Sequence, residues 1–439
     1  MTPASPNPAF DATRRDFLKG AGAAILAAPL LDLAAGPVAR AAGDEELKIA
    51  LIGCGGRGSG AAWQALSTPG KTKLVAIADA FADQLEGTLN GLKQNFGDRI
   101  DVPKERCFVG FDAYKQAIDA GPDVVILTTP PGFRPMHFEY AVKQGKHIFT
   151  EKPVAIDAPG IRQFLAAAQE AKAKNLKVGV GLQRHHDPRY IETVKRIQDG
   201  AIGDIVMLRT YWNSSGVWVR PRQQGQTEME YQMRNWYYFN WLCGDHIVEQ
   251  HIHNLDVANW VMNGYPVEAQ GQGGRQVRTG IDHGEIYDHH MVEFTYANGV
   301  KLLSQCRHIP NTWEEVSEHA HGAKGSADIS AGRIRINGQN EWRWRGDGVD
   351  PYQAEHDALF AAIRSGTPYT EADNGAHSTM TSILGRMATY SGRVVSWKEA
   401  LDSNLAYRPT AYDFQADPPS KPDANGRYAI AIPGQSQAL

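Results

Sequence analysis

The sequence predicts an α/β protein in which a doubly wound parallel sheet is followed by an α+β domain with an open, mostly antiparallel sheet. Two observations support this prediction. Between Leu47 and Thr150, short apolar runs alternate with helical segments, which is typical of parallel sheets covered on both faces. After residue 200, several segments alternate apolar and polar side chains with the period of half-buried strands. The 439 residues suffice for two to three domains with their own cores.

Composition excludes several classes of protein. Hydrophobic residues make up 42% of the chain and charged residues 21%, which rules out wholesale disorder and a fibrous protein. The body of the chain has no apolar run long enough to span a membrane, so none is expected in the mature chain. A formal net charge of -4 gives no electrostatic footprint for nucleic acid. The 4 cysteines are too widely spaced for a disulfide framework.

The N-terminal residues 1–41 are expected to be an export signal rather than part of the fold. Arg14 and Arg15 precede Phe-Leu-Lys at 17–19, a mildly apolar run follows, and the small residues around 39–41 suit a cleavage site. The pattern resembles a twin-arginine signal, which the export machinery reads as an address. We therefore expect the twin-arginine machinery to export the folded protein to the periplasm.

The first strand, expected over Leu47–Ile52, runs directly into the glycine-rich loop 53–58, a GxGxxG match followed by a helical segment. Gly53 permits a tight turn, Gly55 lets the backbone approach a pyrophosphate, and Gly58 lets the helix pack closely on the strand. The loop therefore predicts a dinucleotide site. The expected contacts are Gly53, Gly55, Gly56, Arg57 and Gly58.

The second strand, expected over Lys73–Ala78, ends in Asp79, about 20 residues past Gly58. A carboxylate at this place accepts hydrogen bonds from a ribose 2′-hydroxyl and repels a 2′-phosphate. Asp79 therefore favours NAD over NADP as the cofactor.

The alternation of strands and helices continues to the end of the first domain. Helices are expected over 112–120 and 134–144, and strands over 123–129 and 147–149. Ligands of doubly wound sheets bind outside the carboxyl ends of the strands. Further cofactor contacts are therefore expected from the residues at those ends, namely Thr128, Thr129, Pro130, Glu151 and Lys152.

The second domain is expected to contain strands over 205–211, 289–296 and 300–306, with a hairpin turn at Asn298-Gly299. Helices are expected over 157–172, 352–364 and 379–390. The expected parts of the chain are the export signal at 1–41, a dinucleotide-binding domain at 42–155, a substrate and oligomerisation domain at 156–407, and an extended C-terminal arm at 408–439.

From Leu47 to about Leu405, the chain resembles the Gfo/Idh/MocA oxidoreductase family. The resemblance rests on the glycine loop, Thr128-Thr129-Pro130, His137, Glu151-Lys152-Pro153 and His253-x-x-Asp256-x-x-x-Trp260. It implies a Rossmann-type first domain and a second domain whose broad sheet face serves substrate binding and assembly into a homodimer or homotetramer. It also implies late helices that pack back near the first domain, and it adds His137 to the cofactor site.

The same resemblance assigns the catalytic roles. Lys152 matches the lysine that orients the substrate hydroxyl, and His253 matches the proton acceptor. Glu249 stands where members usually place an aspartate. If Cys243–Trp260 is one helix, Glu249 and His253 lie at i and i+4 and share a face, so the carboxylate can orient the imidazole.

A metal site is the alternative reading of this stretch. Its candidate ligands are Asp245, His246, Glu249, His251 and His253. No HExxH or paired-cysteine pattern supports a metal, so none is expected.

Aromatic residues crowd the second domain, where five of the 10 tryptophans lie between residues 212 and 260. Aromatic rings stack on the C–H face of a sugar, and neighbouring polar side chains can bind its hydroxyls. An aromatic core or an oligomer interface is the alternative. The candidate substrate residues are Arg184, His185, Trp212, Trp236 and Tyr237.

We therefore expect an exported enzyme that transfers a hydride between tightly bound NAD and a hydroxyl of a sugar or glycoside, with the sugar C3 as the candidate position. Free NAD is scarce outside the cytoplasm, so the cofactor would be loaded before export and regenerated in place. One alternative is an NAD-dependent enzyme that cleaves glycosides by oxidation, elimination and re-reduction. Another is a non-catalytic sugar-binding protein on the same fold.

Overall fold

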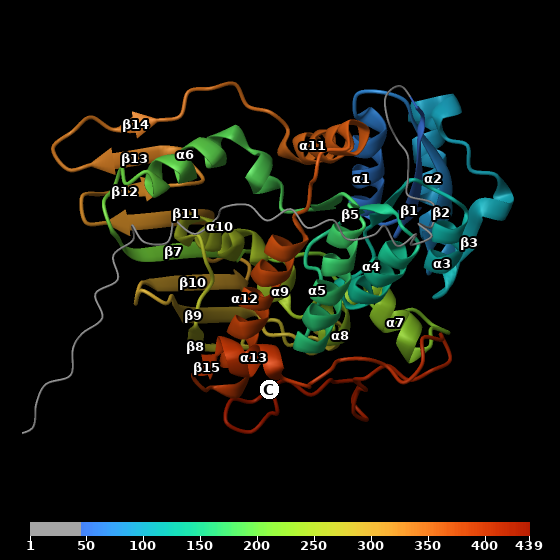
Figure 1. Ribbon diagram of the computed structural model, residues 1–439. Helices are drawn as coiled ribbons and strands as arrows, with labels where there is room; N and C mark the ends of the chain where they lie inside the picture. Colours follow the sequence, from blue (N-terminus) through green and yellow to red (C-terminus); the bar gives the residue numbers. More distant parts are fainter. Residues whose placement is uncertain (1–44) are drawn as a thin grey trace, which may run out of the picture. The chain divides into compact units, whose positions relative to one another are not determined.

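The computed structural model describes residues 45–439, so the expected export signal lies outside the described residues. The first sheet has six parallel strands in the order β3-β2-β1-β4-β5-β6, the arrangement of a doubly wound dinucleotide fold (Figure 1). The strands are β1 (Leu47–Ile52), β2 (Thr72–Asp79), β3 (Cys107–Val109), β4 (Val124–Leu127), β5 (His147–Thr150) and β6 (Val178–Val180). Strand β6 extends this sheet beyond the expected limit at residue 155.

Helices cover both faces of this sheet, as the continuous apolar strands require. On β1, Ile49 and Leu51 face the hydrophobic cluster that includes α1 and α2, while Ala50 and Ile52 face the cluster that includes α3, α4 and α5. The helices are α1 (Gly56–Ser67), α2 (Ala82–Phe96), α3 (Ala113–Asp119), α4 (Arg134–Lys143) and α5 (Ala158–Ala173). Asp157 caps α5 by accepting a hydrogen bond from the Gly160 amide at 2.8 Å.

The second sheet has nine strands in the order β14-β13-β12-β11-β7-β10-β9-β8-β15, with one parallel pair, β7 with β10, among antiparallel neighbours. Its strands are β7 (Ile205–Ser214), β8 (Glu268–Gly274), β9 (His289–Thr295), β10 (Lys301–His308), β11 (Glu315–Gly322), β12 (Gly325–Asp328), β13 (Arg333–Ile336), β14 (Trp342–Arg343) and β15 (Val395–Ser396). The expected strands at β7, β9 and β10 and the hairpin turn at Gly299 are confirmed.

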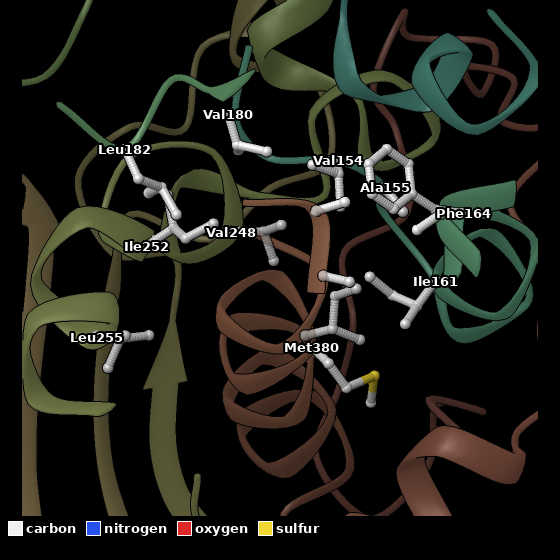
Figure 2. Packing of buried hydrophobic residues seen from close by; sticks show 14 of the residues in the cluster. Val154, Ala155, Ile161, Phe164, Val180, Leu182, Val248, Ile252, Leu255 and Met380 are labelled. Carbon is white, nitrogen blue, oxygen red and sulfur yellow. The ribbon is translucent and has the colours of Figure 1, made fainter. Parts of the chain in front are cut away.

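The remaining helices connect the two sheets. They are α6 (Pro188–Gln198), α7 (Glu228–Arg234), α8 (Asn240–Cys243), α9 (His246–Glu249), α10 (Ile252–Met262), α11 (Pro351–Ser365), α12 (Ala372–Ser391) and α13 (Trp397–Asp402). Figure 2 shows Met380 of α12 among Ile161 of α5, Val248 of α9 and Val154 from the segment after β5. Helix α11 reaches the first domain, where Gln353 donates to the Gln64 carbonyl at 3.1 Å. The expected return of the late helices is therefore confirmed.

The condition under which Glu249 and His253 would share a helix face is not met, because Cys243–Trp260 is not one helix. Gly244 ends α8 in the left-handed conformation at φ 77°, and Asp245 follows at φ 76°. The Asp245 carboxylate then caps α9, and a second break at Gln250 and His251 separates α9 from α10. These breaks place Glu249 and His253 on different helices.

The C-terminal arm, residues 408–439, contains no helix or strand of the described chain. It lies along the surface and buries Tyr428 and Ala438. Among the described residues, no helix is long and apolar enough to cross a membrane.

Candidate active site

The glycine loop has the geometry that its three glycines predict. Gly53 has φ 98°, and a Cβ there would lie 2.6 Å from the Thr129 nitrogen. A Cβ at Gly58 would lie 2.0 Å from the Gly53 carbonyl oxygen, so helix and turn touch at this point. At Gly55 and Gly56, by contrast, nothing lies within 4 Å of a Cβ position. The loop is thus closed toward the sheet and open on the side where a pyrophosphate would approach.

The Asp79 carboxylate lies against this loop. It accepts hydrogen bonds from the Cys54 amide at 2.6 Å and from the Phe81 amide at 2.8 Å. Burial raises the pKa of Asp79, while these two amides lower it in part. The carboxylate is therefore fixed in direction, and its remaining lone pairs face a cavity.

This cavity, of about 640 Å³, extends along the carboxyl ends of the strands. Most of the expected cofactor contacts line it, namely Gly53, Gly55, Gly56, Arg57, Gly58, Asp79, Thr128, Thr129, Pro130 and His137. Glu151 and Lys152 lie outside its lining. An open glycine loop and an oriented carboxylate at the end of β2 fit the diphosphate and ribose of a dinucleotide.

His137 packs into the wall beneath this cavity. Its ring stacks on Tyr114 at 4.0 Å, and its Nδ1 lies 3.2 Å from the Thr129 hydroxyl. Burial, followed by the positive charge of Arg134, lowers the pKa of His137 to about 3, so the ring is neutral. Arg134 donates to the carbonyl oxygens of Thr129 and Glu151 and so ties the ends of β4 and β5 together.

Two ion pairs organise the end of β5. Arg57 of the glycine loop binds Glu151 at 2.5 Å, and Lys152 Nζ binds Glu249 Oε1 at 3.0 Å. Lys152 also donates to the backbone carbonyl of Glu249. The side chains of Lys152 and Glu249 are only 12% and 14% exposed, so this second pair is largely shielded from water. It joins the first domain to the second.

His253 lies in the same region but does not pair with Glu249. Its Nδ1 is buried, and no side chain among the described residues bonds to it. Burial, followed by the positive charges of Lys152 and Arg184, lowers the pKa of His253 well below its usual value. The ring of Trp212 stacks near it at 5.9 Å between centroids, with an interplanar angle of 26°.

Tyr237 is buried close to the Glu249 carboxylate. Its hydroxyl lies near the Glu249 side chain. Burial, followed by the negative charge of Glu249, raises the pKa of Tyr237 well above its usual range. The structure therefore gathers Lys152, Glu249, His253, Trp212 and Tyr237 in one region, next to the glycine loop through Arg57 and Glu151.

Arg184 and His185 already have carboxylate partners. Arg184 binds Glu318, and its guanidinium carbon lies 5.9 Å from the Trp212 ring. His185 Nε2 lies 2.8 Å from Asp256, and its ring stacks on Trp260 at 4.2 Å. Both side chains thus support the aromatic residues of the region.

The candidate metal ligands between Asp245 and His253 do not form one cluster in the fold. Glu249 binds Lys152, and the His251 Nε2 lies 2.7 Å from the Ser304 hydroxyl. Asp245 and His246 instead meet His290 of β9, and their ligand-type atoms lie within 4.8 Å of one another.

Hydrogen bonds account for the buried Asp245 carboxylate. It accepts from the His246 and Tyr287 amides and from the Tyr390 hydroxyl, and His290 Nε2 lies 3.2 Å away. Burial alone would raise the pKa of Asp245, but His290 and these hydrogen bonds hold it well below its usual range. The Asp245 carboxylate is therefore ionised and hydrogen-bonded, and it stabilises the fold at this place.

Sequence reasoning missed the outer wall of the cavity. Trp236, a candidate substrate residue, lines the cofactor cavity, and its ring lies 5.4 Å from that of Tyr237. The other unpredicted lining side chains include Phe81, Phe111, Trp218, Arg220, Tyr231 and Arg234. The aromatic crowding of residues 212–260 was the available signal, but it does not reveal which domain those rings face.

Comparison with known proteins agrees with this geometry. Residues 47–181 match the model described as "Oxidoreductase family, NAD-binding Rossmann fold", and residues 190–328 match the "GFO/IDH/MocA C-terminal domain". Fold and site therefore define an NAD-binding oxidoreductase. More particularly, the chain belongs to the Gfo/Idh/MocA family.

Individual relatives are distant. The inositol 2-dehydrogenase of Rhizobium meliloti (strain 1021) is 27% identical over 281 residues, which cover 64% of this chain and 74% of that enzyme. The 2,7-anhydro-N-acetylneuraminate hydratase of Escherichia coli (strain K12) is 27% identical over 50% of this chain and 55% of its own length. The aldose-aldose oxidoreductase from Caulobacter crescentus, crystallised with glycerol, shares the fold with a TM-score of 0.63 at 19% identity, over 80% of this chain and 100% of that chain.

Proposed function

We propose that this enzyme is exported and transfers a hydride between a retained NAD and a hydroxyl of a sugar or glycoside, with C3 as the candidate position. The observation that carries the proposal is the shielded Lys152–Glu249 ion pair at the end of β5, whose lysine charge acts on the buried His253 ring, with its unpartnered Nδ1. It places a hydrogen-bond donor for the substrate oxygen and a neutral imidazole that can act as a base near a dinucleotide loop, which are the groups that oxidation of a carbinol needs besides a hydride acceptor.

The residues divide the work according to their charge. In the oxidation, a carbinol carbon loses a hydride and its hydroxyl loses a proton, and NAD supplies the hydride acceptor when bound. Lys152 Nζ, fixed by Glu249, can donate a hydrogen bond to the substrate oxygen and stabilise the negative charge that develops on it. His253 can take the hydroxyl proton because burial, which lowers its pKa, keeps the ring neutral.

The surroundings of His253 support a carbohydrate substrate. Trp212 presents an indole ring beside the imidazole, and aromatic rings pack well against the C–H face of a sugar. The inositol 2-dehydrogenase relative acts, by its name, on a ring polyol. The nearly balanced charge of the chain suits an uncharged ligand.

We further propose that NAD stays bound through the catalytic cycle. The twin-arginine pattern supports export of a folded protein, and a free cofactor would be scarce after export. The cofactor would then be regenerated by reduction of a second carbonyl, with His253 returning the proton. We also propose assembly into a homodimer or homotetramer through the open face of the nine-stranded sheet, on which the exposed Met291 lies.

Glycoside cleavage through oxidation, elimination and re-reduction is a second candidate. The observation that favours it is the buried hydroxyl of Tyr237 beside Glu249, a polar group that the oxidation does not use. The name of the hydratase relative also describes chemistry without net oxidation. Release of an aglycone from a chromogenic glycoside would distinguish this activity from simple oxidation.

The proposal is tested with Lys152→Ala. The purified full chain is mixed with a panel of polyols, aldoses and glycosides, and reduction of bound nicotinamide is followed by absorbance. We expect a substrate to reduce the cofactor in the native protein and not in Lys152→Ala, whose thermal unfolding stays cooperative. The control is Lys143→Ala, which removes an exposed lysine of α4 paired with Glu139. Equal reduction by Lys152→Ala and the native protein would refute the assignment.

A further inference from the structure

The second domain supplies the outer wall of the cofactor cavity. The first domain contributes the glycine loop and the strand ends, whereas the opposite side is built from the segment 218–236, which includes α7. We call this segment the cofactor wall. Its cavity-lining members include Trp218, Arg220, Tyr231, Met233, Arg234 and Trp236.

The cofactor wall faces the part of the cavity that begins at Asp79. Phe81, Asp83 and Phe111 follow the ends of β2 and β3, and they line the same cavity. A carboxylate at the end of β2 marks the adenosine ribose of a dinucleotide. Aromatic side chains beyond it, including Trp218 and Trp236 of the wall, line the same cavity, and aromatic side chains are the groups on which a purine stacks.

One side chain fastens the wall to the rim of the first domain. Arg234 makes two hydrogen bonds of 3.1 Å to the carboxylate of Asp83. Its guanidinium carbon also lies 4.0 Å from the centre of the Phe81 ring. A bidentate pair combined with a cation–π contact holds this edge in a defined geometry.

Hydrogen bonds within the second domain brace the wall from behind. Asp282 accepts from the Tyr231 hydroxyl at 2.9 Å, and its backbone carbonyl accepts from Asn235 at 2.8 Å. The side-chain oxygen of Asn235 in turn accepts from the Arg220 amide at 2.9 Å. The wall is therefore an ordered structure rather than a loose loop.

The C-terminal arm ties the wall to the first domain a second time. The Thr227 hydroxyl donates to the Phe414 carbonyl at 2.6 Å, and the Gln232 amide donates to the Ser420 carbonyl at 2.7 Å. The Phe414 ring lies 5.4 Å from Phe81 and 4.9 Å from Phe111. One stretch of the arm thus contacts both sides of the cavity.

We propose that the cofactor wall, clamped by Arg234 and by the C-terminal arm, is a binding site for the adenosine half of NAD and is what retains the cofactor during turnover. This inference deepens the proposed function and rests on it for the identity of the cofactor. Release of the cofactor would require the Arg234–Asp83 contact and the Phe414 contacts to open together.

The test measures release of NADH from the full-length protein. NADH is loaded onto native and variant proteins, excess NAD is added as competitor, and the fall in nicotinamide fluorescence gives the dissociation rate. The variants are Arg234→Ala, Asp83→Asn and Phe414→Ala. The control is Arg393→Ala, which breaks an exposed ion pair with Glu399 elsewhere in the second domain. We expect Arg234→Ala and Phe414→Ala to release NADH roughly tenfold faster or more, and Arg393→Ala to match the native rate.

Rates of NADH dissociation in Arg234→Ala and Asp83→Asn that equal the native rate would overturn the inference. Asp83 and Arg234 have partly exposed side chains, so these two variants should fold even if Phe414→Ala does not. The readout needs no sugar. If no sugar is oxidised but the variants lose NADH faster, the proposed function is wrong and the role of the cofactor wall in retaining the cofactor is supported. If a sugar reduces bound NAD but all variants retain the cofactor equally, only the role proposed for the cofactor wall is refuted.

Discussion

Asp79 offers the sharpest test of cofactor choice, through the substitution Asp79→Asn. The carboxylate uses one oxygen for the Cys54 amide and the other for the Phe81 amide. Asparagine keeps one acceptor oxygen and turns the other position into a donor that opposes an amide N–H. One hydrogen bond to a charged group is lost, which we expect to cost about 1 to 2 kcal/mol of folding stability.

The effect on the cofactor should exceed the effect on stability. Loss of the charged acceptor for the ribose hydroxyls should weaken NAD binding by about 1.5 to 3 kcal/mol, or roughly 10- to 100-fold. The same change removes a negative charge that repels a 2′-phosphate, so NADP binding should hold or improve. The ratio of the two affinities therefore shifts toward NADP.

The assay is fluorescence titration of the cofactor-free protein with NADH and NADPH. Asp101→Asn, which changes an exposed carboxylate of the same domain, serves as the control. If Asp79→Asn left the ratio of NADH to NADPH affinity at the native value, the reasoning from the β2 carboxylate would be refuted.

Three further predictions follow from the geometry. Gly58→Ala should destabilise the protein by about 3 kcal/mol, because its Cβ would lie 2.0 Å from a carbonyl oxygen, whereas Gly56→Ala should change the denaturant midpoint little. Because burial lowers the pKa of His253, its acid limb in the kcat/KM profile should lie below the usual histidine value of about 6.5, and His253→Gln should lose this limb together with about 100-fold or more of the activity; a native limb at about pH 7 or above would contradict this. Asp245→Asn should cost about 3 kcal/mol at neutral pH. The folded-state pKa of Asp245 lies below its unfolded value of about 4. The stability that Asp245 contributes is therefore present above about pH 4 and is lost as pH falls through the folded pKa. Unfolding curves of the native protein and Asp245→Asn, measured at several pH values, should converge in acid.

The first domain was predictable because its signals are local. A buried strand, a glycine turn and a helix follow one another directly, and Asp79 ends the next strand, so spacing alone brings them together. Strand β6 was missed because its three residues, Val178–Val180, carry too little periodicity. Its place in the sheet comes from pairing with β5.

The chain around the candidate site is divided into three short helices for a local reason. Gly244 and Asp245 both adopt positive φ, and an aspartate in that conformation gives no warning in an otherwise helical pattern. The partners of the site residues lie far away in sequence. Glu249 is 97 residues from Lys152, and Arg234 is 151 residues from Asp83. Only the packing of the second domain on the first brings these pairs together.

The most direct test of the account combines the small molecules that leave the protein with the chemistry that it performs. Purified full-length protein is denatured, and the released compounds are identified by mass spectrometry; a second sample receives sugars and polyols without added cofactor, and its nicotinamide absorbance is followed. We expect NAD in the released fraction and its reduction on the protein by at least one of these compounds. A protein that carries no nicotinamide and binds none when it is added would contradict it, as would bound NAD that stays oxidised with every sugar offered.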